Sequence, residues 1–425
     1  MAIFENIRSK NSFILQSGLS GQYSIIGFDP IKILKFQIPS TKYSAFLTKL
    51  EDEAKKYQLN LNIPFTGGAI GFFSYDFGVA LQGISQTVKD DIKIPLAYFI
   101  IPSKIIVFDH KNNELIIIAW AKKKEAAERN IMKLKNMISK RHRTGVLLYA
   151  HTMPSIKSNL TKSVYFQKIQ KIKKLLTAGE TYQVNFSQRF KFKSVKDPFE
   201  IYKKVSKINP SPYQLYLEAE NFSVISNSPE RLFKIEKINR IQSRPIKGTR
   251  PRGKTKKEDQ FLIKELLNSQ KEQAELDMIT DLVRNDLGKI CVKGTVEVNE
   301  NRVVESYSHV HHTMSNVQGI LQENIKLIDI IKALFPGGSI TGCPKYRTIK
   351  IIDKLEDFKR HIYCGSAGYI DGRGNMDFNI MIRTILSVIH DFYFHSGGGI
   401  VYDSDPISEY EEIWHKAEAL MKAIL

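Results

Sequence analysis

One lysine in the chain stands among arginines in a pattern that could make it a nucleophile. The segment SRPIKGTRPRG, residues 243–253, places Lys247 between a strand-like run and a glycine turn. Its other cations are Arg244, Arg250 and Arg252. A free lysine has a pKa of about 10.4, so nucleophilic work requires burial or neighbouring positive charge. The sequence supplies the second condition, and the alternative is a basic surface turn.

Two pairs of glutamates form a second group with chemical potential. Glu272 and Glu275 are three residues apart on one expected helix, and Glu409 and Glu412 are three apart on another, so each pair shares a helix face. Carboxylates that converge from two helices suit Mg²⁺ better than zinc, because no Cys or His ligands accompany them. Two alternatives stay open: the glutamates are solvated surface residues, or Glu412 forms a plain helical ion pair with Lys416.

Histidines and glycines supply further candidates. The run SHVHHTMS contains His309, His311 and His312, and strand alternation would send the last two to opposite faces. One catalytic or core histidine is therefore expected rather than a shared metal site. The glycines of GGSITG and HSGGGIVYD would let backbone amides approach an anion. Lys345 does not complete a nucleotide-binding loop, so a carboxylate ligand stays open.

The elements that must position these residues mix strands and helices without regular alternation. Up to about residue 120 the chain is a series of short β-rich runs separated by turns. Helices are expected at 163–179, 257–289, 324–334, 344–356 and 408–424. Strands are expected around 223–236, 241–247, 303–318, 362–370 and 378–402. This order favours an α+β sandwich, with layered antiparallel sheets covered by helices, over a doubly wound parallel sheet.

Length and composition predict one large folded domain. The 425 residues are 42% hydrophobic and 25% charged, which excludes a disordered or fibrous chain. We find no internal repeat and no low-complexity linker. The expected organisation is a single domain, 1–425, with a β-rich part at 1–121, a basic helix and linker at 122–161, and a core at 162–425. The three cysteines have no close pair, so neither a disulfide framework nor a zinc ribbon is indicated.

The charge of the chain raises a rival class of function. Lys and Arg number 63 against 44 Asp and Glu, a net charge of +19, which would suit a nucleic-acid-binding protein. The densest basic stretch, 122–143, has no interleaved aromatic residues for base stacking, which favours a solvated surface. The first twenty residues lack signal-peptide features, and the apolar run 115–121 is too short to span a bilayer. We therefore expect a cytoplasmic protein with no nucleic-acid or membrane partner.

Taken in order, the motifs of residues 163–425 resemble those of the chorismate-utilising enzyme family. They read PERLFKI, RPIKGT, AELDMITDLVRNDLG, HTMSNV, FPGGSITGCPKYR, YCGSAGYIDGRG, MIRT and GGGIVYDSDPISEYEEIWHKA. FILQSGLSGQYSIIGFDP and GGAIGFFSYD match more loosely. The resemblance, which is to anthranilate synthase component I-like members, implies two antiparallel β-sheets packed together and flanked by helices. It also implies that chorismate is held between Mg²⁺ and basic or backbone donors.

The resemblance assigns roles to particular residues. It implies that Lys247 is the nucleophile, that Glu230 is the general acid for a departing hydroxyl, and that His312 is a further catalytic residue. It implies Mg²⁺ ligation by Glu275 and Glu412, with Glu272 and Glu409 acting through water. The implied substrate contacts are Gln183, Thr249, Ser339, Tyr363, Arg383, Gly398, Gly399 and Lys416.

Two positions separate the activities of the family. Members that add water to chorismate carry a lysine where this chain has Gln183, so water addition is disfavoured. Members that form anthranilate typically read PIAGT, whereas those that form 4-amino-4-deoxychorismate read PIKGT, as here at Lys247. The resemblance thus implies attack of ammonia at C4, with the ammonia supplied by a separate glutamine amidotransferase subunit. Anthranilate formation stays the alternative.

One departure of this sequence from the family's motifs concerns regulation by tryptophan. Tryptophan-binding members often have an acidic residue where this chain has Gln16, although their NPSPY segment is present at 209–213. Tryptophan feedback is therefore not expected, while binding of another amino acid stays open.

Overall fold

The computed structural model describes residues 1–18, 21–37, 42–139, 155–236, 239–307 and 310–424. The strands are β1 Ser12–Gln16, β2 Tyr23–Phe36, β3 Gly68–Phe73, β4 Ala97–Asp109, β5 Glu114–Ala119, β6 Lys157–Ser158, β7 Gln183–Lys193, β8 Tyr213–Glu218, β9 Phe222–Ser228, β10 Arg231–Glu236, β11 Arg240–Arg244, β12 Ile246–Pro251, β13 Glu297–Ser306, β14 Val310–Ile320, β15 Gly342–Cys343, β16 Ser366–Asp371, β17 Met376–Asn379, β18 Thr384–Val388 and β19 Asp391–Ile400.

The helices are α1 Ala2–Ile7, α2 Tyr43–Lys55, α3 Tyr75–Leu81, α4 Lys124–Ser139, α5 Lys162–Thr177, α6 Pro198–Ile208, α7 Lys256–Asn268, α8 Gln270–Gly288, α9 Leu327–Leu334, α10 Lys345–Leu355 and α11 Pro406–Ile424. A short 3₁₀ turn covers Gly338–Ile340.

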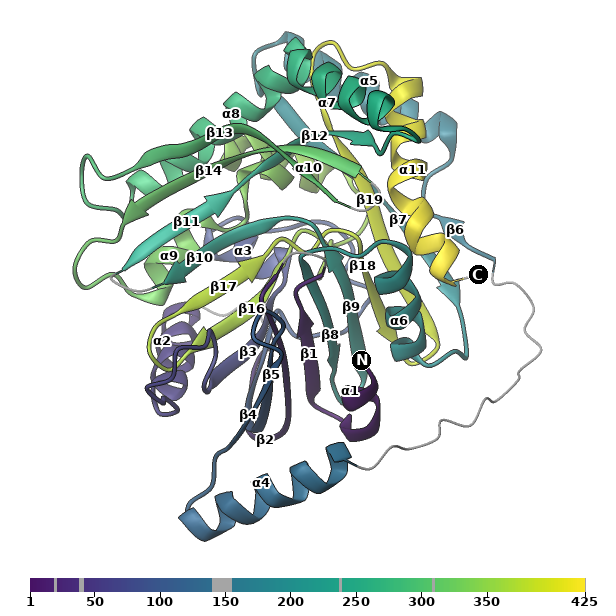
Figure 1. Cartoon of the computed structure of the whole chain (residues 1–425). Helices are drawn as coiled ribbons and strands as arrows, with labels where there is room; N and C mark the ends of the chain where they lie inside the picture. Colours follow the sequence, from purple (N-terminus) through teal and green to yellow (C-terminus); the bar gives the residue numbers. More distant parts are fainter. Residues whose placement is uncertain (19–20, 38–41, 140–154, 237–238, 308–309, 425) are drawn as a thin grey trace.

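Strand pairing divides at β4. On one side β4 pairs with β2, and the order continues through β1, β8, β9, β18, β19 and β7. On the other side β4 pairs with β3, and the order continues through β16, β17, β10, β11 and β14, which also pairs with β12 and β13. Every one of these pairs is antiparallel. The predicted fold class, two antiparallel sheets flanked by helices, is confirmed (Figure 1).

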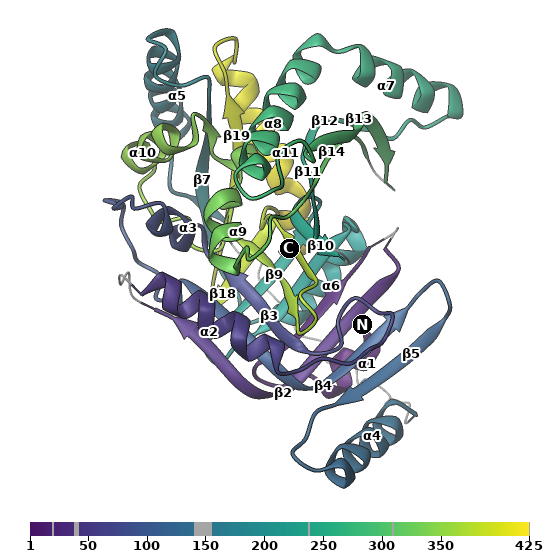
Figure 2. The same cartoon turned by 90° about the vertical axis from the view of Figure 1, so that its left-hand side faces the viewer.

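The apolar runs of the strands are buried on both faces. In β3, Ile70 and Phe72 join a core shared by both sheets, while Ala69 and Phe73 join the core that underlies α2 and α9. Successive side chains of a strand point to opposite faces, so a continuous apolar run requires cover on both sides. Helices α5, α6 and α11 pack on a third cluster with β7 and β19, whereas α8 lies against β12 and β14 (Figures 1 and 2).

The helix predicted at 257–289 is instead two helices. The chain breaks at Ser269, whose hydroxyl accepts a hydrogen bond of 3.4 Å from the backbone N–H of Glu272 and caps α8. A serine followed three residues later by glutamate is a common helix start, so this break had a local signal. The β-rich runs predicted at 223–236, 303–318 and 378–402 each form more than one strand.

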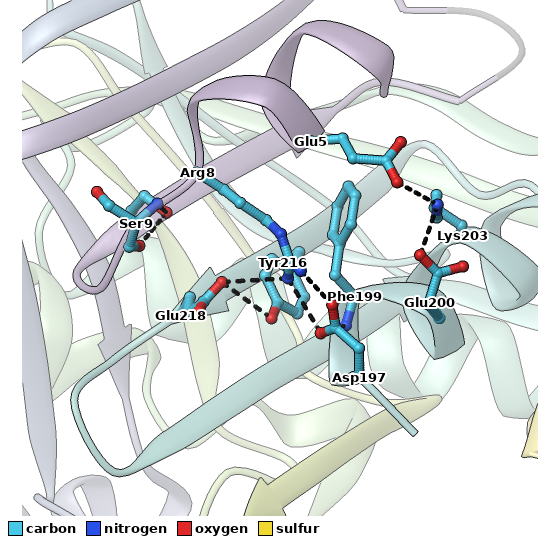
Figure 3. A network of polar contacts seen from close by, with 10 residues as sticks. Glu5, Arg8, Ser9, Asp197, Phe199, Glu200, Lys203, Tyr216 and Glu218 are labelled. Atoms are coloured by element: carbon cyan, nitrogen blue, oxygen red, sulfur yellow. Dashed lines mark hydrogen bonds and ion pairs between the residues drawn. The ribbon is translucent and has the colours of Figure 1, made fainter. Parts of the chain in front are cut away.

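The amino-terminal region is tied to the core by charged contacts. Arg8 donates hydrogen bonds to both carboxylate oxygens of Asp197, which caps α6, and Lys203 pairs with both Glu5 and Glu200 at 2.7 Å (Figure 3). Backbone pairing also joins the regions, because β1 pairs with β8 and β3 with β16. The predicted division into parts at 1–121, 122–161 and 162–425 stays a prediction.

The basic stretch forms α4, which lies beside β5 (Figures 1 and 2). Its described side chains are mostly exposed, and Leu134 is the buried contact. Residues 140–154 of the predicted linker lie outside the described residues. Within the described ranges, no helix combines the length and the apolar character that crossing a membrane requires.

Candidate active site

Lys247 is held by strand pairing beneath α8. It lies opposite Thr313 of β14, and the Thr313 hydroxyl donates a hydrogen bond to the Lys247 carbonyl. The next residue, Gly248, has a φ of +76° at a register shift in the pairing, a conformation that favours glycine. The Lys247 side chain is only 15% exposed, and its Nζ lies 3.7 Å from Oε2 of Glu275. The alternative of a basic surface turn is therefore wrong.

Glu230 occupies the turn between β9 and β10 and is buried. Burial raises the pKa of Glu230 to about 7, although a hydrogen bond with Ser339 and the positive charge of Lys247 oppose this rise. A cavity of about 20 Å³ lies beside both Glu230 and Ser339, enough room for about one water molecule. A carboxyl group with this pKa can donate a proton near neutral pH.

His312 faces the opposite direction from His311, as strand alternation predicts. The Nδ1 atom of His312 lies 2.8 Å from the hydroxyl of Thr249 and 3.3 Å from the carbonyl of Gly248, whereas His311 contacts Ser306 and Asp259. Burial lowers the pKa of His312 to about 4, and the charge of Arg383 adds to the effect. The ring is therefore neutral near pH 7. His309, the third histidine of this run, lies outside the described residues.

Arg383 presents a positive charge that no anionic side chain pairs with in the described part of the chain. It has a φ of +51°, and within the described residues no carboxylate pairs with its guanidinium group. Burial lowers the pKa of Arg383. A desolvated guanidinium favours an anion that can accept two parallel hydrogen bonds, such as a carboxylate.

The glutamates of α8 are both turned toward β12. Glu275 pairs with Lys247, and Oε1 of Glu272 accepts a hydrogen bond of 3.3 Å from Arg250. A Cβ atom on Gly248 would lie 2.8 Å from side-chain atoms of Leu266 and Thr313 and 3.1 Å from Oε2 of Glu272, so the missing side chain leaves room for all three. The solvated-surface alternative is wrong for this pair, because their side chains are about one fifth exposed: 23% for Glu272 and 18% for Glu275.

The glutamates of α11 differ from each other. Glu409 is buried and accepts a hydrogen bond of 2.7 Å from Ser404; burial and the charge of Glu412 raise its pKa. Glu412 is 51% exposed and forms the helical ion pair with Lys416, at 2.6 Å, that the spacing allowed. Desolvation acts against ionisation of Glu412, but Lys416 and then Lys247 hold its pKa below the ordinary value.

These carboxylates fit a magnesium ion in chemistry, although they are held by internal partners. Among the described residues, no three metal-ligating side chains are grouped as a ready-made metal site. The Lys247 ammonium nevertheless stands where a cation is stabilised, since it pairs with Glu275 and its charge reaches Glu412. All four predicted metal ligands supply oxygen, the donor that Mg²⁺ prefers.

Gln183 and the glycines of β19 form another part of the site. Neither amide atom of the buried Gln183 has a hydrogen-bond partner among the described residues. A Cβ atom on Gly399 would overlap its amide nitrogen, so the two residues are in close contact. On Gly398, a Cβ atom would lie 3.1 Å from Oε2 of Glu409 and 3.9 Å from Nζ of Lys416. A buried amide without a partner is uncommon and is a candidate ligand contact.

Tyr363 lies apart from this group in the contacts that the structure records. It is buried in the core, where its ring stacks on His395 with centroids 5.0 Å apart. Among the described residues, no hydrogen bond or ion pair joins Tyr363 to another predicted substrate contact. Its assignment therefore stays a prediction.

Sequence reasoning missed the partners of the metal-ligand candidates. Ser404 anchors Glu409, and Arg250, noted only for its charge, anchors Glu272. Lys271, next to Glu272 in the chain, acts through its charge on both Glu409 and Glu412. No spacing rule predicts these partners, because each depends on where a helix meets a strand or loop distant in sequence.

A large cavity of about 1570 Å³ lies elsewhere in the molecule. Gln16, Pro212 and Tyr213 line it, and none of the predicted site residues does. The side-chain oxygen of Gln16 accepts a hydrogen bond of 2.8 Å from the hydroxyl of Tyr202.

Comparison with known proteins bears on the family of the chain. Residues 11–422 match the family described as chorismate binding enzyme. The chain is 39% identical to aminodeoxychorismate synthase component 1 of Bacillus subtilis (strain 168), over 98% of this chain and 92% of that protein. It is 36% identical to anthranilate synthase component 1 of Lactococcus lactis subsp. lactis (strain IL1403), over 99% and 96% of the two chains.

A solved structure has the same fold. Anthranilate synthase component I from Streptococcus pneumoniae TIGR4 superposes with a TM-score of 0.86 and 29% identity, covering 96% of this chain and 93% of the other. The relatives carry two different names, yet the family match extends over nearly the whole chain. This protein belongs to the chorismate binding enzyme family.

Proposed function

We propose that the chain is component I of an aminodeoxychorismate synthase, which converts chorismate and ammonia into 4-amino-4-deoxychorismate. The observation that carries this proposal is the position of Lys247, whose ammonium pairs with Glu275 and whose charge acts on Glu230. The family members that form aminodeoxychorismate carry a lysine at this position. The product would feed the synthesis of 4-aminobenzoate and folate.

The reaction would begin with Lys247 and Glu230 acting on opposite ends of a conjugated system. The Lys247 amine forms a bond to C2 of chorismate, two double bonds shift, and the C4–O bond breaks. Glu230 donates its proton to the departing hydroxyl, which leaves as water. Ammonia then attacks C4, the double bonds shift back, and the lysine is expelled. His312, neutral at pH 7, can accept a proton during these steps.

Two of the substrate contacts would come from side chains that have no internal partner among the described residues. Arg383 is suited to a carboxylate, and the Gln183 amide and the backbone of Gly398 and Gly399 can contact the ring carboxylate or enolpyruvyl group. Mg²⁺, held by Glu275 and Glu412 with Glu272 and Glu409 behind water, would stabilise charge on the ring carboxylate. Thr249, Ser339, Tyr363 and Lys416 complete the proposed set.

A glutamine amidotransferase subunit would supply the ammonia, and both proteins would work in the cytoplasm. The relatives named component 1 support a multi-subunit enzyme. The chain would therefore use free ammonium in the absence of its partner.

Product analysis tests the proposal. The purified chain is incubated with chorismate, Mg²⁺ and ammonium, and the products are separated by chromatography. We expect 4-amino-4-deoxychorismate as the main product. Anthranilate as the main product would overturn the assignment in favour of the other named relatives.

A further inference from the structure

Each proposed metal ligand is occupied by a group of the chain itself. Glu272 is bound by Arg250, Glu409 by Ser404 and Glu412 by Lys416, and each of these contacts is within hydrogen-bond distance. The fourth contact, between Lys247 and Glu275, is longer, at 3.7 Å. The pairing of Lys247 is therefore an ion pair without a hydrogen bond, and it is the longest of the four contacts.

Lys247 also acts beyond its direct partner. Its charge lowers the pKa of Glu412 on α11 and opposes the rise in the pKa of Glu230. The ammonium thus lies within electrostatic reach of proposed ligands from both helices. A divalent cation bound between α8 and α11 would meet this charge at close range, and like charges that share a partly desolvated site repel each other strongly.

We propose that Lys247 and the metal ion compete for Glu275. In the metal-free chain the Lys247 ammonium is the counter-ion of Glu275, and the metal ion replaces it when it binds. Lys247 then swings away from Glu275 toward the substrate position, so that metal binding also releases the nucleophile. This inference rests on the proposed function, because it takes Mg²⁺ as the ion that the two helices hold.

Metal affinity in the absence of chorismate tests this competition. Mn²⁺, a probe for Mg²⁺, is titrated into the full chain by calorimetry, so that no catalytic turnover enters the readout. Lys247→Met removes the competing charge and should bind Mn²⁺ about tenfold more tightly than the parent. Lys247→Arg keeps the charge and should bind no more tightly than the parent.

A matched control comes from the same helix as Glu412. Lys422 pairs with Glu418 on α11 at 2.7 Å, so Lys422→Met removes a lysine–glutamate pair outside the site. This variant should keep the parent affinity, which separates local competition from a change in net charge. The proposal would be overturned if Lys422→Met or Lys247→Arg raised the affinity for Mn²⁺ as much as Lys247→Met does.

Mn²⁺ binding by the variant Glu275→Gln tests the proposed magnesium site itself. If this variant loses Mn²⁺ binding while Lys247→Met binds with parent affinity, the metal site stands and the competition is overturned. If Glu275→Gln binds Mn²⁺ like the parent, the metal lies elsewhere, and both the competition and the proposed ligand set are wrong. Thermal unfolding of each variant confirms that it is folded before titration.

Discussion

The Nζ atom of Lys247 lies 3.7 Å from Oε2 of Glu275, across the contact between strand β12 and helix α8. The pair joins the proposed nucleophile to a proposed metal ligand. Because neither side chain is more than 18% exposed, the attraction between them is less screened than at a surface. The position of this lysine therefore depends on what else binds the carboxylate.

Replacing Lys247 tests its chemical role. Lys247→Ala removes the amine that attacks C2, so formation of 4-amino-4-deoxychorismate should fall by about 100-fold or more. Turnover is measured by chromatography with ammonium as the nitrogen source. Lys422→Ala, which removes a lysine of α11 outside the site, should leave the rate unchanged. A Lys247→Ala enzyme with parent turnover would exclude a covalent step.

Glu230 should couple stability to pH. Its pKa is about 7 in the folded chain and about 4.3 when exposed in an unfolded chain. Between these values the folded state binds more protons than the unfolded state, so the free energy of unfolding falls as pH rises and levels off above pH 7. The total loss is about 4 kcal/mol. Glu230→Gln should remove it, making the variant more stable than the parent at pH 8 and similar at pH 4.

The substitution Glu230→Gln should lower activity although it raises stability above pH 7. The parent requires protonated Glu230, so kcat/KM should decline as pH rises above about 7, whereas Glu230→Gln should lose about 100-fold or more at every pH. Chemical denaturation and turnover are measured on the same samples. A variant that is less stable than the parent at pH 8 would show that Glu230 is ionised and well paired in the fold.

Arg383 should contribute mainly to substrate binding. Since no described carboxylate neutralises its guanidinium, Arg383→Met should raise KM for chorismate by about 10- to 100-fold. Arg383→Lys keeps the charge but loses the bidentate geometry, so it should recover only part of the affinity. Initial rates over a range of chorismate concentrations separate KM from kcat. An unchanged KM in Arg383→Met would place the substrate carboxylates elsewhere.

The metal assignment is tested on α11. Glu412→Gln should raise the Mg²⁺ concentration needed for half-maximal activity by about tenfold or more, because a neutral amide is a weaker ligand than a carboxylate. Glu418→Gln, on the same helix and paired with Lys422, serves as the control and should not change it. Wild-type metal dependence in Glu412→Gln would reject this ligand.

Close packing at Gly399 offers a steric test. Gly399→Ala should lower kcat/KM, because its methyl group would overlap the amide of Gln183. The double variant Gly399→Ala with Gln183→Ala removes the overlapping amide, so it should regain the folding stability of the parent. It should not regain full activity if the Gln183 amide contacts substrate. Recovery of full activity in the double variant would show that Gln183 only fills space.

Sequence predicted the fold class and the family better than the contacts among the candidate site residues. Irregular alternation of strands and helices indicated antiparallel sheets, and the motifs around Lys247 and Glu412 identified the family. The pairing of Lys247 with Glu275 could not be predicted, because it requires β12 to pair with β14 and α8 to cover both. The alternative of a basic surface turn for Lys247 stayed open in the sequence, since burial is set by tertiary packing.

The boundary between α7 and α8 did have a local signal in the sequence. The break between α7 and α8 at Ser269 follows from a serine cap, yet the long periodic pattern from 257 to 289 outweighed it in the prediction. The unequal exposure of Glu409 and Glu412 has no local signal, because both have the same spacing and only the fold places Ser404 beside one of them.

The covalent intermediate on Lys247 is the central claim, and mass spectrometry tests it most directly. The chain is incubated with chorismate and Mg²⁺ without ammonia, quenched and digested. We predict that the peptide containing Lys247 gains the mass of chorismate less one water, and that ammonium discharges this adduct as 4-amino-4-deoxychorismate. Product formation at the parent rate with no adduct on Lys247 at any time would contradict the account.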